Sequence, residues 1–93
     1  MFVLMSIHHP KPGHEAAVID SMHRYGNAIR GKPGLVSIHT LKDAGSPRLV
    51  GLAIFESQEA FEKLAPIARG AVANDPFDVW EQGPIDGFRL EEV

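Results

Sequence analysis

Residues 31–41 read Gly-Lys-Pro-Gly-Leu-Val-Ser-Ile-His-Thr-Leu, and this stretch decides how the rest of the chain is arranged. Gly31 can end a helix by adopting the left-handed conformation, and Pro33 prevents the helix from resuming. From Leu35 onward the residues are mostly apolar and suit an extended strand that carries one imidazole, that of His39. The stretch therefore predicts a helix upstream of it and a strand in its second half.

A strand and a helix are predicted before this stretch. Residues 2–9 contain no Asp, Glu, Lys or Arg, and both alternating faces begin apolar, which is typical of a strand covered on both sides. Residues 10–13 read Pro-Lys-Pro-Gly, a turn that cannot continue strand pairing. Residues 14–30 place four large side chains on one helical face: Val18, Met22, Tyr25 and Ile29.

The second half of the chain repeats this alternation of strands and helices. Residues 48–55 are apolar, and a polar turn joins them to the preceding strand in a predicted hairpin. Three further segments follow: a helix capped by Ser57, an irregular segment over residues 74–84 and a strand over residues 85–93. Pro66 is expected to break the helix because proline removes a hydrogen bond and clashes with the preceding turn. Gly87 is expected to mark a bulge in the last strand.

The predicted elements follow the order β-α-β-β-α-β, which is the ferredoxin-like arrangement. We therefore expect one α+β domain over residues 1–93, with a four-stranded antiparallel sheet and two helices on one face. In a single copy the other face of the sheet would expose a large apolar area. A homodimer in which two sheets pack face to face, a dimeric α+β barrel, would cover that area.

Composition excludes several classes of function. The 93 residues carry a net charge of −3, 44% of them are hydrophobic, and none is cysteine. Without a basic run the chain lacks the footprint of nucleic-acid binding, and without cysteine it has neither disulfides nor a thiolate nucleophile. The apolar run in the first ten residues is too short to span a bilayer and has no basic leader. We therefore expect a cytoplasmic protein that does not associate with membranes.

Three motifs carry a resemblance to a known family. They are Lys11-Pro12-Gly13 before the first helix, Lys32-Pro33-Gly34-Leu35 before the second strand, and Phe55-Glu56-Ser57-Gln58-Glu59-Ala60 before the second helix. In this order and spacing they resemble the antibiotic biosynthesis monooxygenase (ABM) domain over residues 3–73. The resemblance implies a dimeric α+β barrel. The family includes cofactor-independent quinone-forming monooxygenases, haem-degrading enzymes and signal-molecule isomerases, so it indicates the fold better than the reaction.

Two departures from the family pattern limit what the resemblance implies. The usual Trp-Glu-Ser motif begins here with Phe55, which keeps the aromatic bulk but lacks the indole N–H. The haem-degrading branch needs asparagine, tryptophan and histidine at the positions that correspond to Ser6, Leu64 and Asn74, so haem degradation is rejected. The implied activity then needs no cofactor.

Histidines supply the candidate catalytic groups. His8 shares a strand face with Ser6, and if that face looks toward the helices, its imidazole can act as a general base or hydrogen-bond donor to a phenol or enol. His39 lies on a mostly apolar strand, either in the dimer interface or in a pocket. A third hypothesis comes from a resemblance to the YCII-related branch of the same superfamily, which implies a dyad of His23 and Asp75.

The remaining candidates are binding residues. Six positions are expected to contact a small-molecule substrate: Ser6, Tyr25, Phe55, Leu64, Phe77 and Trp80. No metal site is expected, because the adjacent His8 and His9 point to opposite faces of their strand. Two functions remain open: a cofactor-independent monooxygenase that acts on a small aromatic or quinol-type molecule, or a non-catalytic dimeric barrel that binds a small apolar ligand.

Overall fold

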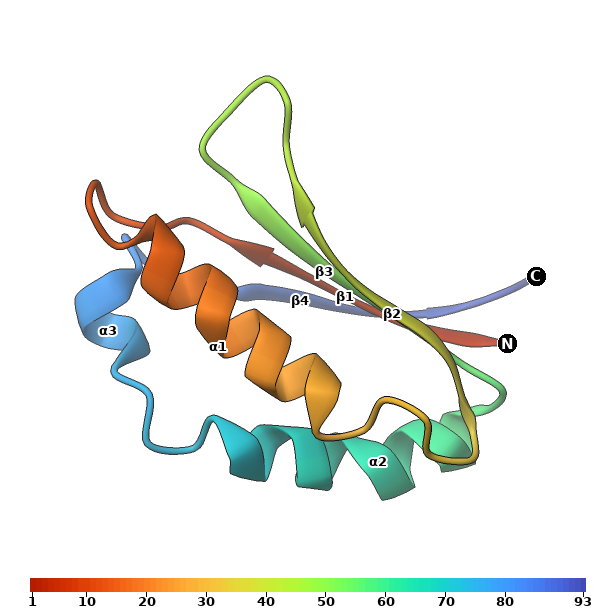
Figure 1. Cartoon of the computed structure of the whole chain (residues 1–93). Coiled ribbons are helices and arrows are strands. Elements are labelled where there is room, and N and C mark those ends of the chain that lie inside the picture. Colours follow the sequence, from red (N-terminus) through yellow and green to blue (C-terminus); the bar gives the residue numbers. More distant parts are fainter.

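The computed structural model describes all 93 residues and contains four strands and three helices (Figure 1). In chain order the elements are β1 (Phe2–His8), α1 (Glu15–Asn27), β2 (Leu35–Lys42), β3 (Leu49–Phe55), α2 (Gln58–Ala71), α3 (Phe77–Trp80) and β4 (Asp86–Glu91). The predicted ferredoxin-like order is confirmed, with the short helix α3 inside the segment expected to be irregular. None of the helices is long and apolar enough to cross a membrane.

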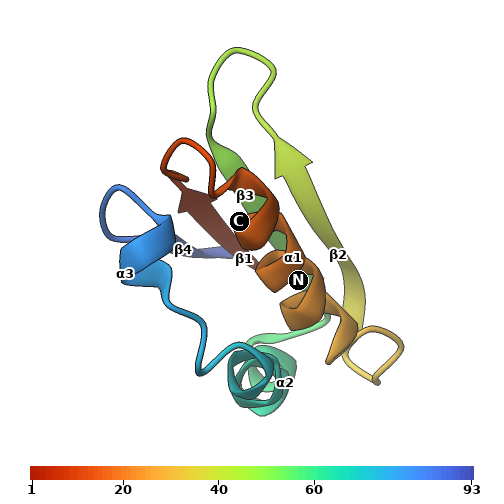
Figure 2. The ribbon, with the colours of Figure 1, turned by 60° about the vertical axis from the view of Figure 1, so that its left-hand side comes forward.

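The four strands form one antiparallel sheet in the order β2-β3-β1-β4. Strand β1 lies inside the sheet, paired with β3 on one side and β4 on the other, as its two apolar faces predict. Helices α1 and α2 cover the same face of the sheet, and the other face carries no helix (Figures 1 and 2). The expected architecture is therefore confirmed for the single chain.

A β-bulge in β2 determines which side chains of that strand face the helices. Leu35 pairs with Phe55 and Ser37 with Ile54, so Val36 is an extra residue between two regular pairs. Simple alternation would put Leu35, Ser37 and His39 on one face, but the bulge places Leu35 on the helix side and the other two on the opposite face. The expected bulge at Gly87 is wrong, because β4 pairs with β1 without any shift in register.

Aromatic rings fill one end of the space between the sheet and the helices. The ring centroids of Phe2 and Phe61 lie 5.0 Å apart, and those of Phe55 and Phe61 lie 5.5 Å apart in an edge-to-face contact. Phe55 is fully buried, and Leu64 and Ile29 belong to the same cluster. This end, which we call the closed end, holds most of the apolar core.

Helix α2 corrects one expectation about Pro66. The helix begins as predicted, since the Ser57 hydroxyl accepts a hydrogen bond from the Ala60 backbone N–H at 3.1 Å. It then runs without a break through Pro66 to Ala71. Pro66 and Glu62 are both exposed, so the Glu62 carbonyl that loses its helical partner can bind water. Burial of one apolar face therefore outweighs the cost of the proline.

The two glycines of the central stretch have different functions in the fold. Gly31 has φ +82°, the left-handed conformation that was predicted to follow α1. Gly34 has φ +97°, and a β-carbon placed there would lie only 2.8 Å from the Ala60 β-carbon. Gly34 therefore allows the entry to β2 to pass close to the first turn of α2.

Candidate functional site

A cavity of about 330 Å³ lies between the sheet and the helices, beyond the closed end. Its sheet side includes Leu4, Ser6 and His8 of β1, Gly51 and Ala53 of β3, and Ile38 and Thr40 of β2. Its helix side includes Met22, Tyr25 and Gly26 of α1 and Phe61 and Arg69 of α2. Phe77, Ile85 and Arg89 complete the wall from the C-terminal part of the chain. The mainly apolar wall suits a small organic ligand.

The cavity exists because the middle of the sheet carries small residues. Ser6 of β1 pairs with Gly51 on β3 and with Gly87 on β4. A β-carbon at Gly51 would lie 2.6 Å from the Ser6 hydroxyl oxygen, whereas one at Gly87 would meet nothing within 4 Å. Ser6 and Gly51 are therefore adjacent small residues in the cavity wall, and Met22 of α1 lies above Gly51. We call this region the open end.

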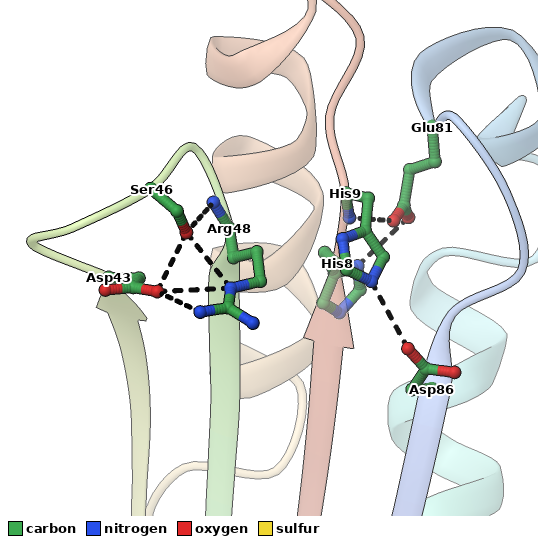
Figure 3. A network of polar contacts seen from close by, with 7 residues as sticks. All are labelled: His8, His9, Asp43, Ser46, Arg48, Glu81 and Asp86. Atoms are coloured by element: carbon green, nitrogen blue, oxygen red, sulfur yellow. Dashed lines mark hydrogen bonds and ion pairs between the residues drawn. The ribbon is translucent and has the colours of Figure 1, made fainter.

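A buried histidine–glutamate pair lies at the open end (Figure 3). His8 Nδ1 lies 3.0 Å from Glu81 Oε2, and both side chains are at least nine-tenths buried. The other carboxylate oxygen, Oε1, accepts a hydrogen bond from the His9 backbone N–H at 3.0 Å. Glu81 follows α3, and its strand-like bridge to Pro10 holds it beside the end of β1. Both carboxylate oxygens are thus occupied, as burial requires.

These contacts fit one tautomer of a neutral imidazole at His8. Because the Glu81 carboxylate only accepts, the neutral His8 ring donates through Nδ1. Its Nε2 is then an acceptor, and it lies 3.1 Å from the Ser6 hydroxyl oxygen, which donates to it. The Nε2 lone pair is thus held by Ser6, and a bound hydroxyl that replaces Ser6 as the donor can pass its proton to Nε2.

A second histidine–carboxylate contact lies nearby but differs in exposure. His9 Nε2 is 3.2 Å from Asp86 Oδ2, with 36% and 59% of the two side chains exposed. Because His9 points away from His8, as adjacent strand residues do, this contact lies outside the cavity. It joins the end of β1 to the start of β4. No group of three His, Asp or Glu side chains is positioned to hold a metal ion.

Six of the residues selected from the sequence line the cavity: Ser6, His8, His23, Tyr25, His39 and Phe77. Phe55 and Leu64 do not, because they are buried in the closed end, so their expected place in the pocket is corrected to the core. Trp80 is also corrected. It packs against the second apolar cluster around Val18 and Leu49, and it forms one side of an edge-to-face pair with Phe77 at 5.9 Å.

The other two proposed catalytic groups are placed differently from His8. His39 pairs with Leu52, and alternation puts its exposed side chain on the face away from the helices, although part of the residue borders the cavity. Asp75 accepts hydrogen bonds from Ser21 at 2.6 Å and from Arg24 at 2.8 Å, and not from His23. The Arg24 contact, followed by that of Ser21, lowers the pKa of Asp75.

Three arginines line the cavity and give its wall a positive charge: Arg30, Arg69 and Arg89. No Asp or Glu lines the cavity. Burial raises the pKa of Tyr25, and the positive charge of Arg69 opposes that effect. The Tyr25 hydroxyl makes no hydrogen bond within the chain and stays protonated at neutral pH, so it is a free donor in a positively charged wall.

Sequence reasoning missed Glu81 and Arg89. Glu81 lies 73 positions from His8 in a segment without periodicity, so no local signal marked it. Arg89 could have been found, because alternation from Gly87 in the last strand puts it on the helix side.

Comparisons with known proteins agree with this fold. No family model and no curated protein matches the sequence. Among solved structures, the chain is similar to the protein Rv0793 of Mycobacterium tuberculosis, with 16% identity, 99% of this chain and 94% of that chain covered, and a TM-score of 0.82. It is also similar to a candidate antibiotic biosynthesis monooxygenase from Nitrosomonas europaea, with 19% identity and a TM-score of 0.76. This match covers 100% of this chain and 99% of that chain.

A further candidate antibiotic biosynthesis monooxygenase, from Deinococcus radiodurans, matches at 12% identity and a TM-score of 0.78, with 100% of this chain and 93% of that chain covered. The chain therefore has the ferredoxin-like fold of ABM structures over its full length. At such identities the likeness shows the fold alone, and the reaction has to be argued from the cavity.

Proposed function

We propose that this protein is a cofactor-independent monooxygenase that oxidises a small phenol or quinol bound in the cavity. The observation that carries the proposal is the buried pair of His8 and Glu81, which places an imidazole in the wall of the cavity. A single oriented base suits a reaction in which the substrate supplies its own electrons.

The proposed reaction begins when His8 Nε2 accepts the proton of the substrate hydroxyl. The resulting phenolate transfers one electron to O₂, which gives an aryloxyl radical and superoxide. These recombine at a ring carbon that bears hydrogen, forming a hydroperoxide, and loss of water leaves a carbonyl at that carbon. One oxygen atom of O₂ enters the quinone product and the other leaves as water. Glu81 stabilises the imidazolium that forms in the first step.

The Ser6 hydroxyl, although it contacts His8, is better suited to hold the imidazole than to attack a substrate. A serine nucleophile needs backbone donors to stabilise an oxyanion. Ser6 lies in the middle of β1, which is hydrogen-bonded to strands on both sides, so the neighbouring N–H groups are used by the sheet. A ligand hydroxyl can instead replace Ser6 as the donor to Nε2.

Oxygen uptake with a panel of hydroquinones and naphthols tests the proposal. We expect uptake by the wild-type chain and a loss of about 10²-fold or more in His8→Ala, the range for removal of a positioned base. His39→Ala is the matched control, because that histidine lies on the opposite face. Equal activity in the wild type and His8→Ala would contradict the assignment, as would loss only in His39→Ala.

A second variant tests the cavity itself. Gly87→Leu adds a side chain next to Ser6, a residue of the cavity wall, where no atom lies within 4 Å, so we expect it to occupy the space beside Ser6 with little strain. Gly83→Leu is its control, since that site is equally open but precedes β4 and pairs with no residue of the cavity wall. We expect only Gly87→Leu to abolish both ligand binding and oxygen uptake. Binding without uptake by the wild type would favour the non-catalytic ligand-binding barrel.

We also propose that the chain forms a homodimer through the sheet face that carries no helix. Apolar side chains on that face include Val3, Met5, Ile7, Leu52, Ile54, Phe88 and Leu90. Phe88 is 42% exposed and Leu90 is 43% exposed in the single chain. Sedimentation should give about twice the chain mass of 10.2 kDa, and Phe88→Asp should shift it to the single-chain mass. A wild-type particle of single-chain mass at micromolar concentration would contradict the dimer.

A further inference from the structure

The arginines of this chain fall into two groups. Arg24 binds Asp75 and Asp20, and Arg48 binds Asp43, so both have acidic partners. The other three, Arg30, Arg69 and Arg89, have no acidic partner, and all three line the cavity. Although the chain has a net charge of −3, its cavity wall contains no acidic residue. The unpaired cations are thus gathered where a ligand would bind.

Two of these arginines lie on the same side of the cavity as aromatic rings. Arg89 projects from β4 on the helix side, opposite Leu4, and its guanidinium lies 5.4 Å from the centroid of the Phe61 ring. Arg69 is in the last turn of α2, and its charge acts on the hydroxyl of Tyr25. This arrangement provides two guanidinium groups and one hydroxyl as donors beside flat apolar surfaces.

We infer that the cavity binds an aromatic carboxylate, with Arg69 and Arg89 contacting the carboxylate and His8 contacting a ring hydroxyl. Guanidinium groups match the planar carboxylate and form charge-assisted hydrogen bonds with it. The inference rests on the proposed function for the role of His8, and it adds the substrate class.

The spacing along β1 agrees with such a ligand. Arg89 lies opposite Leu4, and the His8 Nε2 atom reaches back to the level of Ser6. Two residues of a strand span about 7 Å, so the backbone levels from which the two groups reach the cavity are separated by about the length of one aromatic ring or a fused pair of rings. Arg30 lies on the other side of α1, next to Ile38, and is left out of the proposed contact.

Binding of two matched probes tests the inference. The probes are 6-hydroxy-2-naphthoic acid and its carboxamide, which share a ring system and hydroxyl and differ in charge. We expect the acid to bind at least about tenfold more tightly, and we expect Arg89→Gln and Arg69→Gln each to remove most of that preference. Arg48→Gln is the control, because its guanidinium lies at the β2–β3 turn, and it should keep the full preference.

Two further measurements separate this inference from the proposed function. Equal affinity for acid and amide, or an acid preference that persists in the Arg69→Gln, Arg89→Gln double variant, would overturn the carboxylate inference even if both probes support oxygen uptake. An arginine-dependent acid preference without oxygen uptake would support the carboxylate site while contradicting the monooxygenase proposal. Thermal unfolding of each variant without ligand confirms that the chain is folded in the binding assay.

Discussion

The two ends of the space between the sheet and the helices are built from the same elements but filled differently. At the closed end Phe2, Phe55 and Phe61 pack into contact with one another. At the open end Ser6 lies between two glycines and beside a histidine whose partner comes from outside the sheet.

One strand contributes to both ends. The helix-side residues of β1 are Phe2, Leu4, Ser6 and His8, so side chains become smaller and then polar along a single face. The decrease in side-chain size from Phe2 to Ser6 accompanies the change from a sealed core at one end to a cavity at the other. Stability and ligand binding therefore depend on different residues of the same layer, and substitutions can separate them.

The largest effect on stability is expected from Phe55→Ala at the closed end. Removing this fully buried ring leaves a void, and such changes cost about 3–5 kcal/mol of unfolding free energy. Ser6→Ala at the open end should cost about 1 kcal/mol or less, because it removes one hydrogen bond beside an existing cavity. Urea denaturation measures both. Similar losses for the two variants would contradict the division into two ends.

The next effect in size is expected from Gly34→Ala, where α2 meets the entry to β2. The new methyl group would lie 2.8 Å from Ala60 and the backbone has φ +97°, so overpacking and strain add to about 2–3 kcal/mol. Gly31→Ala is matched in backbone conformation but has open space around it, and it should cost roughly 1 kcal/mol. If thermal unfolding shows the same loss of stability in the Gly34→Ala and Gly31→Ala variants, the close contact between Gly34 and α2 is not the cause of that loss.

A smaller stability change with a specific signature is expected from Glu81→Gln at the open end. The amide keeps one acceptor oxygen, whereas the His8 ring N–H and the His9 backbone N–H now donate to two. We therefore expect the unfolding free energy to fall by about 1–2 kcal/mol. The substitution also favours a proton on His8 Nε2, which removes the acceptor that faces the cavity. Nitrogen-15 NMR of the imidazole should detect this change of tautomer. An unchanged tautomer with lost activity would contradict the positioning role of Glu81.

The smallest effect is expected at the β2–β3 turn, far from both ends. Hydrogen bonds from the Gly45 backbone, Ser46 and Arg48 lower the pKa of Asp43 to about 2, and Figure 3 shows the contacts with Ser46 and Arg48. Because the pKa of Asp43 is lower in the folded chain than in the unfolded chain, the ionised carboxylate stabilises the fold. This stabilisation is present above about pH 4 and is lost as the pH falls toward 2. Denaturation of Asp43→Asn should show a shallower loss of stability over that interval, and an identical pH profile would contradict the assignment.

Much of the fold could be predicted because it follows from local patterns. Val18, Met22 and Ile29 are buried at the helical spacing found in the sequence, and Ser57 caps α2 as its position predicted. The interruption at Pro66 was not borne out, because the local cost of proline is smaller than the gain from the buried face of α2. For α2, tertiary burial thus outweighed the local rule, whereas the bulge expected at Gly87 failed in an exposed strand.

The candidate site could be predicted only in part. Ser6 and His8 were found because alternation along β1 is local, and their side of the sheet follows once the helices cover one face. Glu81 could not be found, since the loop after α3 has no periodicity that reveals its direction. Phe55, Leu64 and Trp80 were assigned to the pocket from their size, but large apolar side chains fill the core equally well.

By itself, the sequence determined the order of the strands and helices, the turns at Gly31 and Gly34 and the apolar faces, because these depend on residues close together in the chain. Only the tertiary structure decided that His8 meets Glu81, since that contact joins the end of β1 to a loop 73 residues away. It also decided, through the extra residue Val36, which face of the sheet His39 occupies. A one-residue shift moves every side chain beyond it to the other face of the sheet. The pairing between strands determines where in the chain that shift occurs.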